Sequence, residues 1–245
     1  MSRPCSWTSG LRSRSRRPAP GITEIRRRVR ARREYHSGMR ALLALAAIVA
    51  SPPDVQKLML TPAQVGPDYV VVQRADGHGV KNTVTLNVCG AAATYPSESQ
   101  RLTRLQVDYL KQKSTLGLSN EVVTYKPGGA AQAIREVLRH VASCPKKAIV
   151  TDKSLPPLKY TLTRVTGAKL LKGYVALRVR VTGVVQGKKV DQTSYAIYQR
   201  KGDVLSGTYS FGPNTKAQLQ FALHAAQESA LNLRLGRAAG GGPTA

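Results

Sequence analysis

The residues that could do chemistry in this chain are few and lie far apart. The chain has four histidines among 245 residues. His78, His140 and His224 follow the Arg-rich N-terminal segment, and none has the spacing to cysteines or carboxylates that metal ligation requires. HExxH, GxSxG and CxxC motifs are absent, as is a Gly-rich phosphate loop of the required length. We therefore predict a protein that is not an enzyme and that uses no metal and no cofactor.

The sequence YKPGG at residues 125–129 is a candidate anion site. Gly128 and Gly129 open a predicted helix, and the first turn of a helix presents free N–H groups and the positive end of the dipole. Lys126 would add a positive charge beside them. The alternative is that proline and glycine here only turn the chain from a strand into the helix.

A second candidate is a strand face that carries Tyr174, Arg178 and Arg180, with Tyr198 and Arg200 expected beside it on the next strand. Basic side chains interleaved with aromatic rings can bind phosphates or stack on bases of single-stranded nucleic acid. The alternative is that the C-terminal helix covers this face, so that only its polar edge is exposed.

Three further polar residues have plainer interpretations. His78 lies in Asp76-Gly77-His78-Gly79, where it is a candidate for polar ligand contact or part of an ordinary turn. Glu98 and Glu121 are interpreted as ion-pair or capping partners of neighbouring arginines and lysines, not as a general acid and base.

The N-terminal region has the pattern of a leader. Residues 1–38 contain eleven arginines and two acids, so they cannot bury a core. Residues 39–51 then read as a signal peptide, with Arg40 as the basic part, Ala41–Ala50 as the apolar part and small residues before Pro52. That apolar run is too short for a stable membrane span. The alternatives for this run are a buried core helix or a retained anchor. Residues 1–38, which should be disordered, are either an over-extended start, with Met39 as the initiator, or an unusually long basic region of the signal peptide.

Removing residues 1–51 takes away twelve arginines and two acids, which lowers the formal charge from +25 to +15. A basic surface attracts nucleic acid, anionic lipid or anionic cell-envelope polymers, and charge alone does not choose among them. The alternative is a secreted domain whose basic surface is only solvated and binds no anionic partner, because such a domain would have the same composition.

The number of cysteines helps to predict the cellular compartment in which the protein folds. Cys5 lies in the leader, which leaves Cys89 and Cys144 as an even pair. Outside the cytoplasm a disulfide is the natural expectation, and two unpaired buried thiols are the alternative. A bond closing this loop of 55 residues would stabilise the fold by about 4 kcal/mol on the chain-entropy model.

Hydrophobic patterning predicts one α+β domain over residues 52–237, a largely antiparallel sheet covered by two helices, followed by a flexible tail at 238–245. A helix is predicted from Gly128–Gly129 to Ser143, and another from about Thr215 to Leu233 with Asn214 or Thr215 as its cap. The predicted strands, bounded by turn residues, are Tyr69–Gln73, Thr83–Cys89, Arg101–Leu110, Asn120–Tyr125, Leu158–Val165, Gly173–Gly183, Gln192–Gln199 and Val204–Phe211. Arg101–Leu110 also suits a helix.

Several short motifs resemble a known family. They are LNVCG at Leu86–Gly90, YPSE at Tyr95–Glu98, RLTRLQV from Arg101, SNEVVTYKPGGAAQAIREV at Ser119–Val137 and SCP at Ser143–Pro145. Over roughly Leu58–Cys144 the chain is similar to the extracytoplasmic sensor-domain family of actinobacterial secreted proteins and lipoproteins, related to the extracellular domain of PknH-like Ser/Thr kinases. The resemblance implies a secreted or surface-tethered ligand-sensing module in which the two motif cysteines are paired.

Together these features favour a non-enzymatic extracytoplasmic sensor or ligand-binding domain. The expected ligand is an anionic small molecule or a cell-envelope polymer, with a membrane signalling protein as a candidate partner. The alternative is a basic nucleic-acid-binding protein that keeps its Arg-rich arm inside the cell. A hydrolase whose site assembles from residues without a local motif is a third hypothesis.

Overall fold

The computed structural model describes residues 54–89, 94–150, 156–167, 169–212 and 216–236. The predicted leader, signal peptide and tail, and the predicted cap at Asn214 or Thr215, lie outside the described residues. No helix in the described ranges is both long and apolar enough to cross a membrane.

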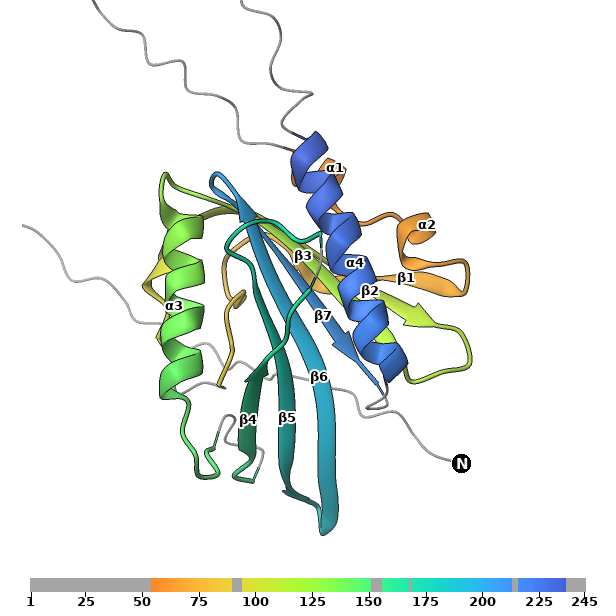
Figure 1. Cartoon of the computed structure of the whole chain (residues 1–245), viewed down its shortest axis with the longest axis vertical. Coiled ribbons are helices and arrows are strands. Elements are labelled where there is room, and N and C mark those ends of the chain that lie inside the picture. The colour runs from red at the N-terminus through yellow and green to blue at the C-terminus, as the bar shows by residue number, and fades with distance from the viewer. Residues whose placement is uncertain (1–53, 90–93, 151–155, 168, 213–215, 237–245) are drawn as a thin grey trace, which may run out of the picture. The chain divides into compact units, whose positions relative to one another are not determined.

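The centre of the fold is one antiparallel sheet of seven strands in the order β1-β2-β3-β7-β6-β5-β4 (Figure 1). The predicted α+β class is therefore confirmed. The alternative of a helix at Arg101–Leu110 is excluded, since this segment pairs with strands on both sides. The strands are β1 Tyr69–His78, β2 Arg101–Lys111, β3 Gly117–Tyr125, β4 Lys159–Arg164, β5 Val175–Val185, β6 Lys188–Lys201 and β7 Val204–Phe211.

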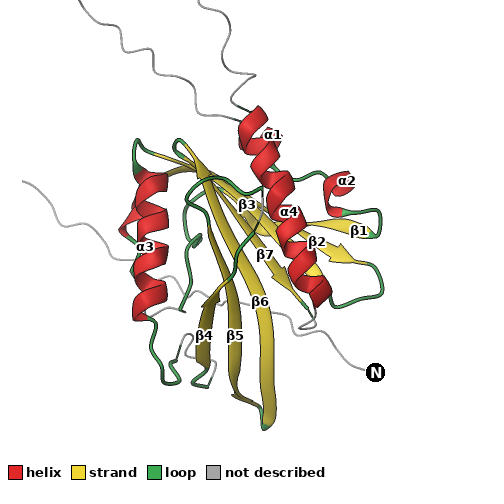
Figure 2. Ribbon diagram, viewed as in Figure 1, coloured by secondary structure: helices red, strands yellow, loops and turns green. Residues whose placement is uncertain are grey.

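Helices cover both faces of this sheet (Figure 2). Successive strand residues point to opposite faces, and Val123 packs with α3 whereas Val122 packs with α4. We call the two sides the α3 face and the α4 face. The helices are α1 Val55–Leu58, α2 Pro62–Val65, the 3-10 helix η1 Pro96–Gln100, α3 Gly129–Ser143 and α4 Lys216–Leu235.

The α4 face is tightly packed because α4 presents small residues to the sheet. Ala222, Ala225 and Ala226 are fully buried, so the helix backbone comes close enough for the Gln199 amide on β6 to donate to the Ala226 carbonyl at 2.7 Å. The Ser206 and Ser229 hydroxyls also meet across this interface at 2.6 Å. Buried polar atoms are thus paired between helix and sheet, which fixes where α4 lies.

Sequence patterns did not predict α1, α2 or η1. Four- and five-residue helices show no helical periodicity. Local caps support α1 and α2, and a contact with α3 holds η1. Thr61 and Gln64 make a capping box around α2. The buried Glu136 carboxylate of α3 accepts from the Ser97 N–H at 3.2 Å and from the Ser97 hydroxyl at 2.5 Å, which anchors η1 to α3.

The predicted strand at Thr83–Cys89 is wrong. Its backbone runs irregularly over the α3 face and pairs with no neighbouring strand. Side chains take the place of a strand partner: Glu98 accepts from the N–H groups of Thr85 and Leu86, and the Tyr95 hydroxyl accepts from Val88 N–H. Leu86 and Val88 are buried, which accounts for the apolar pattern. We call residues 79–89 the covering loop.

The predicted disulfide between Cys89 and Cys144 is confirmed, with Cα atoms 5.7 Å apart. Cys144 ends α3 and Cys89 ends the described part of the covering loop. The bond therefore ties this loop to the helix that shares its face of the sheet.

We expect the double substitution Cys89→Ser/Cys144→Ser to lower the melting temperature under oxidising conditions by roughly 10 °C. Without the disulfide, the unfolded chain regains the conformational entropy of an open loop of 55 residues. Dithiothreitol should lower the wild-type melting temperature by a similar amount and leave the variant unchanged. The matched control is Ser143→Ala, at an exposed neighbouring position. Equal melting temperatures for oxidised wild type and the double variant would contradict a stabilising disulfide.

Candidate functional site

A cavity of about 410 Å³ lies on the α3 face, between the strands that form its floor and the covering loop that forms its wall. Its lining combines polar side chains with an apolar strip. The residues that line it are Asp76, Asn82, Thr83, Val84, Thr85, Asn87, Val88, Arg104, Gln106, Glu121, Leu177, Val179, Ser194, Tyr195, Ala196, Tyr198 and Tyr209.

A buried ion pair lies at the floor of the cavity. Arg104 on β2 and Glu121 on β3 meet at 2.5 Å, and their side chains are only 2% and 1% exposed. Burying charges is costly unless every charged atom finds a partner. Glu121 also accepts from the Thr85 hydroxyl at 2.8 Å and from the Tyr209 hydroxyl at 3.0 Å.

The other guanidinium nitrogens of Arg104 also have hydrogen-bond acceptors within the protein. Nη1 donates to the carbonyls of Asp76 at 3.1 Å and Gly77 at 3.3 Å. Nη2 donates to the Gln106 amide oxygen, and the Gln106 amide nitrogen donates to Ser119 at 2.6 Å. The ion pair is thus an internal structural centre whose charge is neutralised inside the protein.

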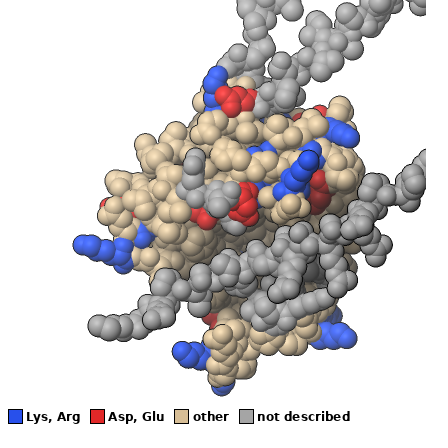
Figure 3. Space-filling model, turned by 180° about the vertical axis from the view of Figure 1, so that it is seen from behind, with Lys and Arg blue, Asp and Glu red and all other residues tan. Residues whose placement is uncertain are grey.

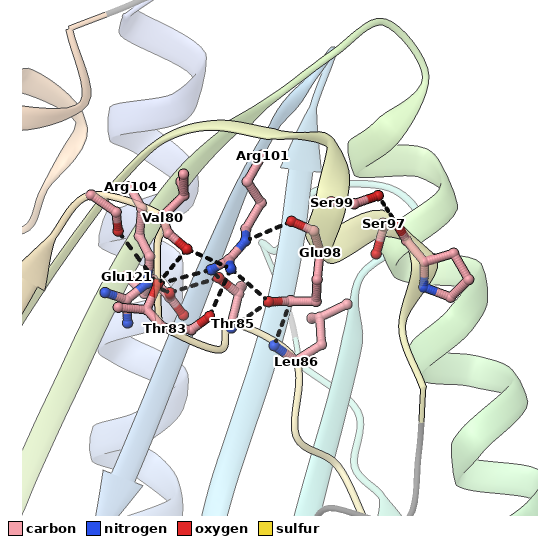
Figure 4. Close-up of polar contacts among 12 residues, drawn as sticks. Val80, Thr83, Thr85, Leu86, Ser97, Glu98, Ser99, Arg101, Arg104 and Glu121 are labelled. Atoms are coloured by element: carbon pink, nitrogen blue, oxygen red, sulfur yellow. Dashed lines mark hydrogen bonds and ion pairs between the residues drawn. The ribbon is translucent and has the colours of Figure 1, made fainter. Parts of the chain in front are cut away.

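A second ion pair fastens the covering loop to the sheet (Figure 4). Arg101 contacts Glu98 at 3.1 Å and donates to the carbonyls of Val80 at 3.0 Å and Thr83 at 2.7 Å. Burial raises the pKa of the Glu98 carboxyl, and its bonds with the Thr85 and Leu86 N–H groups and the charge of Arg101 only partly offset that rise.

The aromatic side of the cavity is made of uncharged phenols. Tyr198 and Tyr209 meet edge to face with centroids 5.7 Å apart. Burial raises the pKa of both hydroxyls, and the nearby Glu121 carboxylate raises them further. Both rings therefore stay neutral at physiological pH and can offer hydrogen bonds and ring surface.

The charged groups on the floor of the cavity are held by one another and by neighbouring residues. The only carboxylate on the floor, Glu121, is held by Arg104, Thr85 and Tyr209, so it is not placed to take a proton from a ligand. In the ranges that the structure describes, no group of three or more histidine, cysteine or acidic residues could hold a metal ion. Leu177, Val179 and Ala196 add an apolar strip beside the polar groups, as ligand pockets usually do.

The predicted anion site lies elsewhere, at the start of α3. Gly128 has φ 82°, a left-handed conformation that favours glycine. Its N–H donates to the Asp203 carboxylate at 2.7 Å, so an acid of the chain itself occupies that donor. Lys126 is exposed and Gly129 is buried against Tyr125.

The predicted basic face is on the other side of the sheet. Tyr174, Arg178 and Arg180 belong to the α4 face. The prediction that Tyr198 and Arg200 share it is wrong. Tyr198 packs against α3, and Arg200, two residues further along β6, points to the same face as Tyr198.

Tyr174 and Arg180 of this face are already engaged within the protein. The Tyr174 hydroxyl accepts from Gly167 N–H at 2.9 Å. Arg180 makes a two-point contact with Asp191 at 2.8 and 2.6 Å, which raises the pKa of Arg180 and lowers that of Asp191. His78 is exposed at the end of β1. Of the predicted site residues, Tyr198 lines the cavity, whereas the start of α3, the Tyr174, Arg178 and Arg180 face and His78 lie at three places outside it.

Two strands carried a signal that could have indicated the cavity floor. In β2, Arg104, Gln106 and Asp108 alternate with Leu105, Val107 and Tyr109. Polar side chains at every second position of a strand are expected to face solvent, yet Arg104 and Gln106 are buried. Glu121 was correctly interpreted as an ion-pair partner, as was Glu98.

Comparisons with known proteins add little to this geometry. No protein-family model and no curated protein sequence matches the chain. The crystal structure of the extracellular domain of PknH from Mycobacterium tuberculosis is similar to it with a TM-score of 0.47 and 14% identity, over 71% of this chain and 93% of that chain. Similarity at this level establishes neither a family nor a ligand, so the resemblance seen in the sequence stays a prediction.

We expect Glu121→Gln to destabilise the protein by about 3 kcal/mol in urea unfolding, since it leaves the buried Arg104 charge without its counterion. Adding Arg104→Gln should recover part of that loss, a coupling that a double-mutant cycle measures. The matched control is Asp191→Asn, which breaks an exposed ion pair and should cause no measurable change. Equal effects of Glu121→Gln and Asp191→Asn would contradict the buried pair.

Proposed function

We propose that this protein is a non-enzymatic extracytoplasmic ligand-binding domain of the sensor type, and that the cavity beneath the covering loop is its binding site. The observation that carries the proposal is a concave site of about 410 Å³ in which a few fixed polar groups adjoin an apolar strip. The Cys89–Cys144 disulfide and the predicted signal peptide support an oxidising compartment outside the cytoplasm.

The charge balance of the lining favours an uncharged ligand in this cavity. Arg104 is the only basic side chain of the lining and is neutralised by Glu121. An anion would find no surplus positive charge there. On the face drawn in Figure 3, the described basic side chains that are not covered by grey residues stand at separate points, with acidic ones among them. We therefore propose a neutral ligand with hydroxyl or amide groups and one apolar side, such as a small saccharide.

Ligand binding would bridge the two parts of the site. A molecule in the cavity touches the sheet through Ser194 and Tyr198 and the covering loop through Asn82 and Asn87. The loop has few backbone bonds of its own and depends on side chains for its position. A bound ligand adds contacts to that loop, whose changed surface a membrane signalling partner would detect.

We expect Ala196→Trp to abolish ligand binding, because the half-buried Ala196 lines the cavity and an indole would fill it. Binding is measured by saturation-transfer NMR with neutral mono- and disaccharides and uncharged amides, beside a set of phosphorylated sugars and dicarboxylates. Neutral binders should be found with the wild-type chain and lost with the variant.

The control for this experiment is Thr161→Trp, which places the same ring on an exposed position of β4 outside the cavity. It should keep all binders, and the melting temperatures of both variants check that the fold is retained. Binding that survives Ala196→Trp in a folded protein, binding of anions alone, or no binder in either set would contradict the proposal.

The compartment is tested by the intact mass of the native protein from separated cell and culture fractions, before and after reduction. We expect a chain that begins near Pro52 outside the membrane and gains two mass units on reduction of the one disulfide. A reduced and unprocessed chain inside the cell would contradict secretion. It would favour the Arg-rich N-terminal segment as a nucleic-acid-binding arm.

A further inference from the structure

A second cavity, of about 530 Å³, adjoins the cavity beneath the covering loop. Strands β5, β6 and β7 contribute to both cavities, and Ser194 of β6 lines both of them. The two cavities therefore meet at Ser194. We call the cavity beneath the covering loop the first cavity and its neighbour the second cavity.

The second cavity continues the first along the same strands. On β5, Val179 lines the first cavity and Val181 lines the second. On β7, Tyr209 lines the first cavity and Phe211 lines the second. Side chains two positions apart on a strand point to the same face and lie roughly 7 Å apart. The two cavities are thus successive hollows along the α3 face.

The second cavity lies where β6 separates from β7. The ladder between these strands ends at Tyr195 and Ser210, whereas β6 stays paired with β5 as far as the turn that joins them (Figure 1). The ring of Phe211 lies over Gly117 of β3, where the lack of a Cβ atom leaves room for it. Phe211 is 38% exposed. An accessible aromatic ring therefore forms one wall of the cavity.

The chemistry of this lining is neutral and of two kinds. None of the described residues that line the second cavity is charged. Val181 and Phe211 form apolar surface, while Thr115, Gln192 and Ser194 add hydroxyl and amide groups beside it.

This combination distinguishes between two neutral occupants. An acyl chain would cover the hydroxyl and amide groups without giving them hydrogen-bond partners, which costs free energy. A sugar ring can place its C–H face on the apolar wall while its hydroxyl groups bond the polar side chains. The lining therefore favours a sugar unit over a lipid chain in the second cavity.

We propose that the two cavities form one elongated site for a linear neutral saccharide, with one sugar unit in the first cavity and the next in the second. This inference rests on the proposed function, because it extends the same site. Ser194 lies at the junction, within reach of both units. Leu177, Val179 and Val181 alternate along β5 and provide an apolar strip beneath both. The ligand is thus a glycan chain and not a free monosaccharide.

The proposal is tested by isothermal titration calorimetry with homo-oligosaccharides of glucose, mannose and N-acetylglucosamine, each as monomer, dimer, trimer and tetramer. The octyl glycoside of each monosaccharide is measured beside them. In at least one series the trimer should bind wild type about tenfold more tightly than the monomer, since a second unit adds hydrogen bonds and ring contact. The octyl chain should give no comparable gain.

Gln192→Trp is the blocking variant, because Gln192 is exposed and lines only the second cavity. Its indole should remove the difference in affinity between trimer and monomer. Thr161→Trp places the same ring on an exposed position of β4 outside both cavities and should keep that difference. Circular dichroism and melting temperatures check that both variants are folded.

The outcomes separate this proposal from the proposed function. A monomer that binds wild type and is lost in Ala196→Trp would support the proposed function. Equal affinities for monomer and trimer would then overturn the elongated site alone. So would a tighter octyl glycoside than trimer, or a folded Gln192→Trp variant that keeps the full gain. Absence of binding by every saccharide would overturn both proposals.

Discussion

The buried contact between Arg104 and Glu121 is the constraint on which the α3 face depends. Two opposite charges inside a sheet are tolerated only if their remaining donors and acceptors are satisfied. β2 itself supplies Gln106, and β7 supplies Tyr209. The carbonyls of Asp76 and Gly77, near the end of β1, accept from Arg104, and the Thr85 hydroxyl of the covering loop donates to Glu121. The covering loop between β1 and β2 thus crosses this face, and the cavity lies between it and the sheet.

A second set of side-chain contacts explains why the covering loop needs no strand partner. Its N–H groups at Thr85, Leu86 and Val88 are all satisfied by side chains. The Arg101 guanidinium donates hydrogen bonds to the carbonyls of Val80 and Thr83 in the same loop. Such a loop is fixed in place by a few polar contacts instead of a continuous ladder. Removing one of its partners would disturb it more than removing one bond from a strand.

Much of the architecture could be predicted from the sequence, because it follows from local patterns. The alternation of Leu105, Val107 and Tyr109 identifies β2, and the spacing of Ile134, Val137 and Val141 identifies α3. Thr83–Cys89 has the same β-type composition as a strand, and only the distant Glu98 and Tyr95 side chains decide otherwise. Strand pairing is also a long-range property.

The candidate site also depends on contacts between distant residues, which local sequence patterns do not predict. Its floor comes from alternate residues of β2, β3 and β5–β7, and its wall comes from a loop that local rules assign wrongly. The anion site at Gly128 was argued from a feature that is real, a helix start with a left-handed glycine. The sequence did not reveal that Asp203, on the turn between β6 and β7, supplies a carboxylate to that N–H. A local motif thus indicates what a segment can bind. The tertiary structure decides whether another residue of the same chain already occupies that site.

The covering loop joins the stability of this domain to its proposed binding. One end of the loop is held by Arg101, and the other is held by the disulfide to α3. Between them lie Asn82 and Asn87, which line the cavity, and Val84, which is 62% exposed. Thr85, Leu86 and Val88 are fixed as well, by bonds to Glu98, Glu121 and Tyr95. The same side-chain contacts that stabilise the loop therefore hold the wall of the cavity against the sheet that forms its floor.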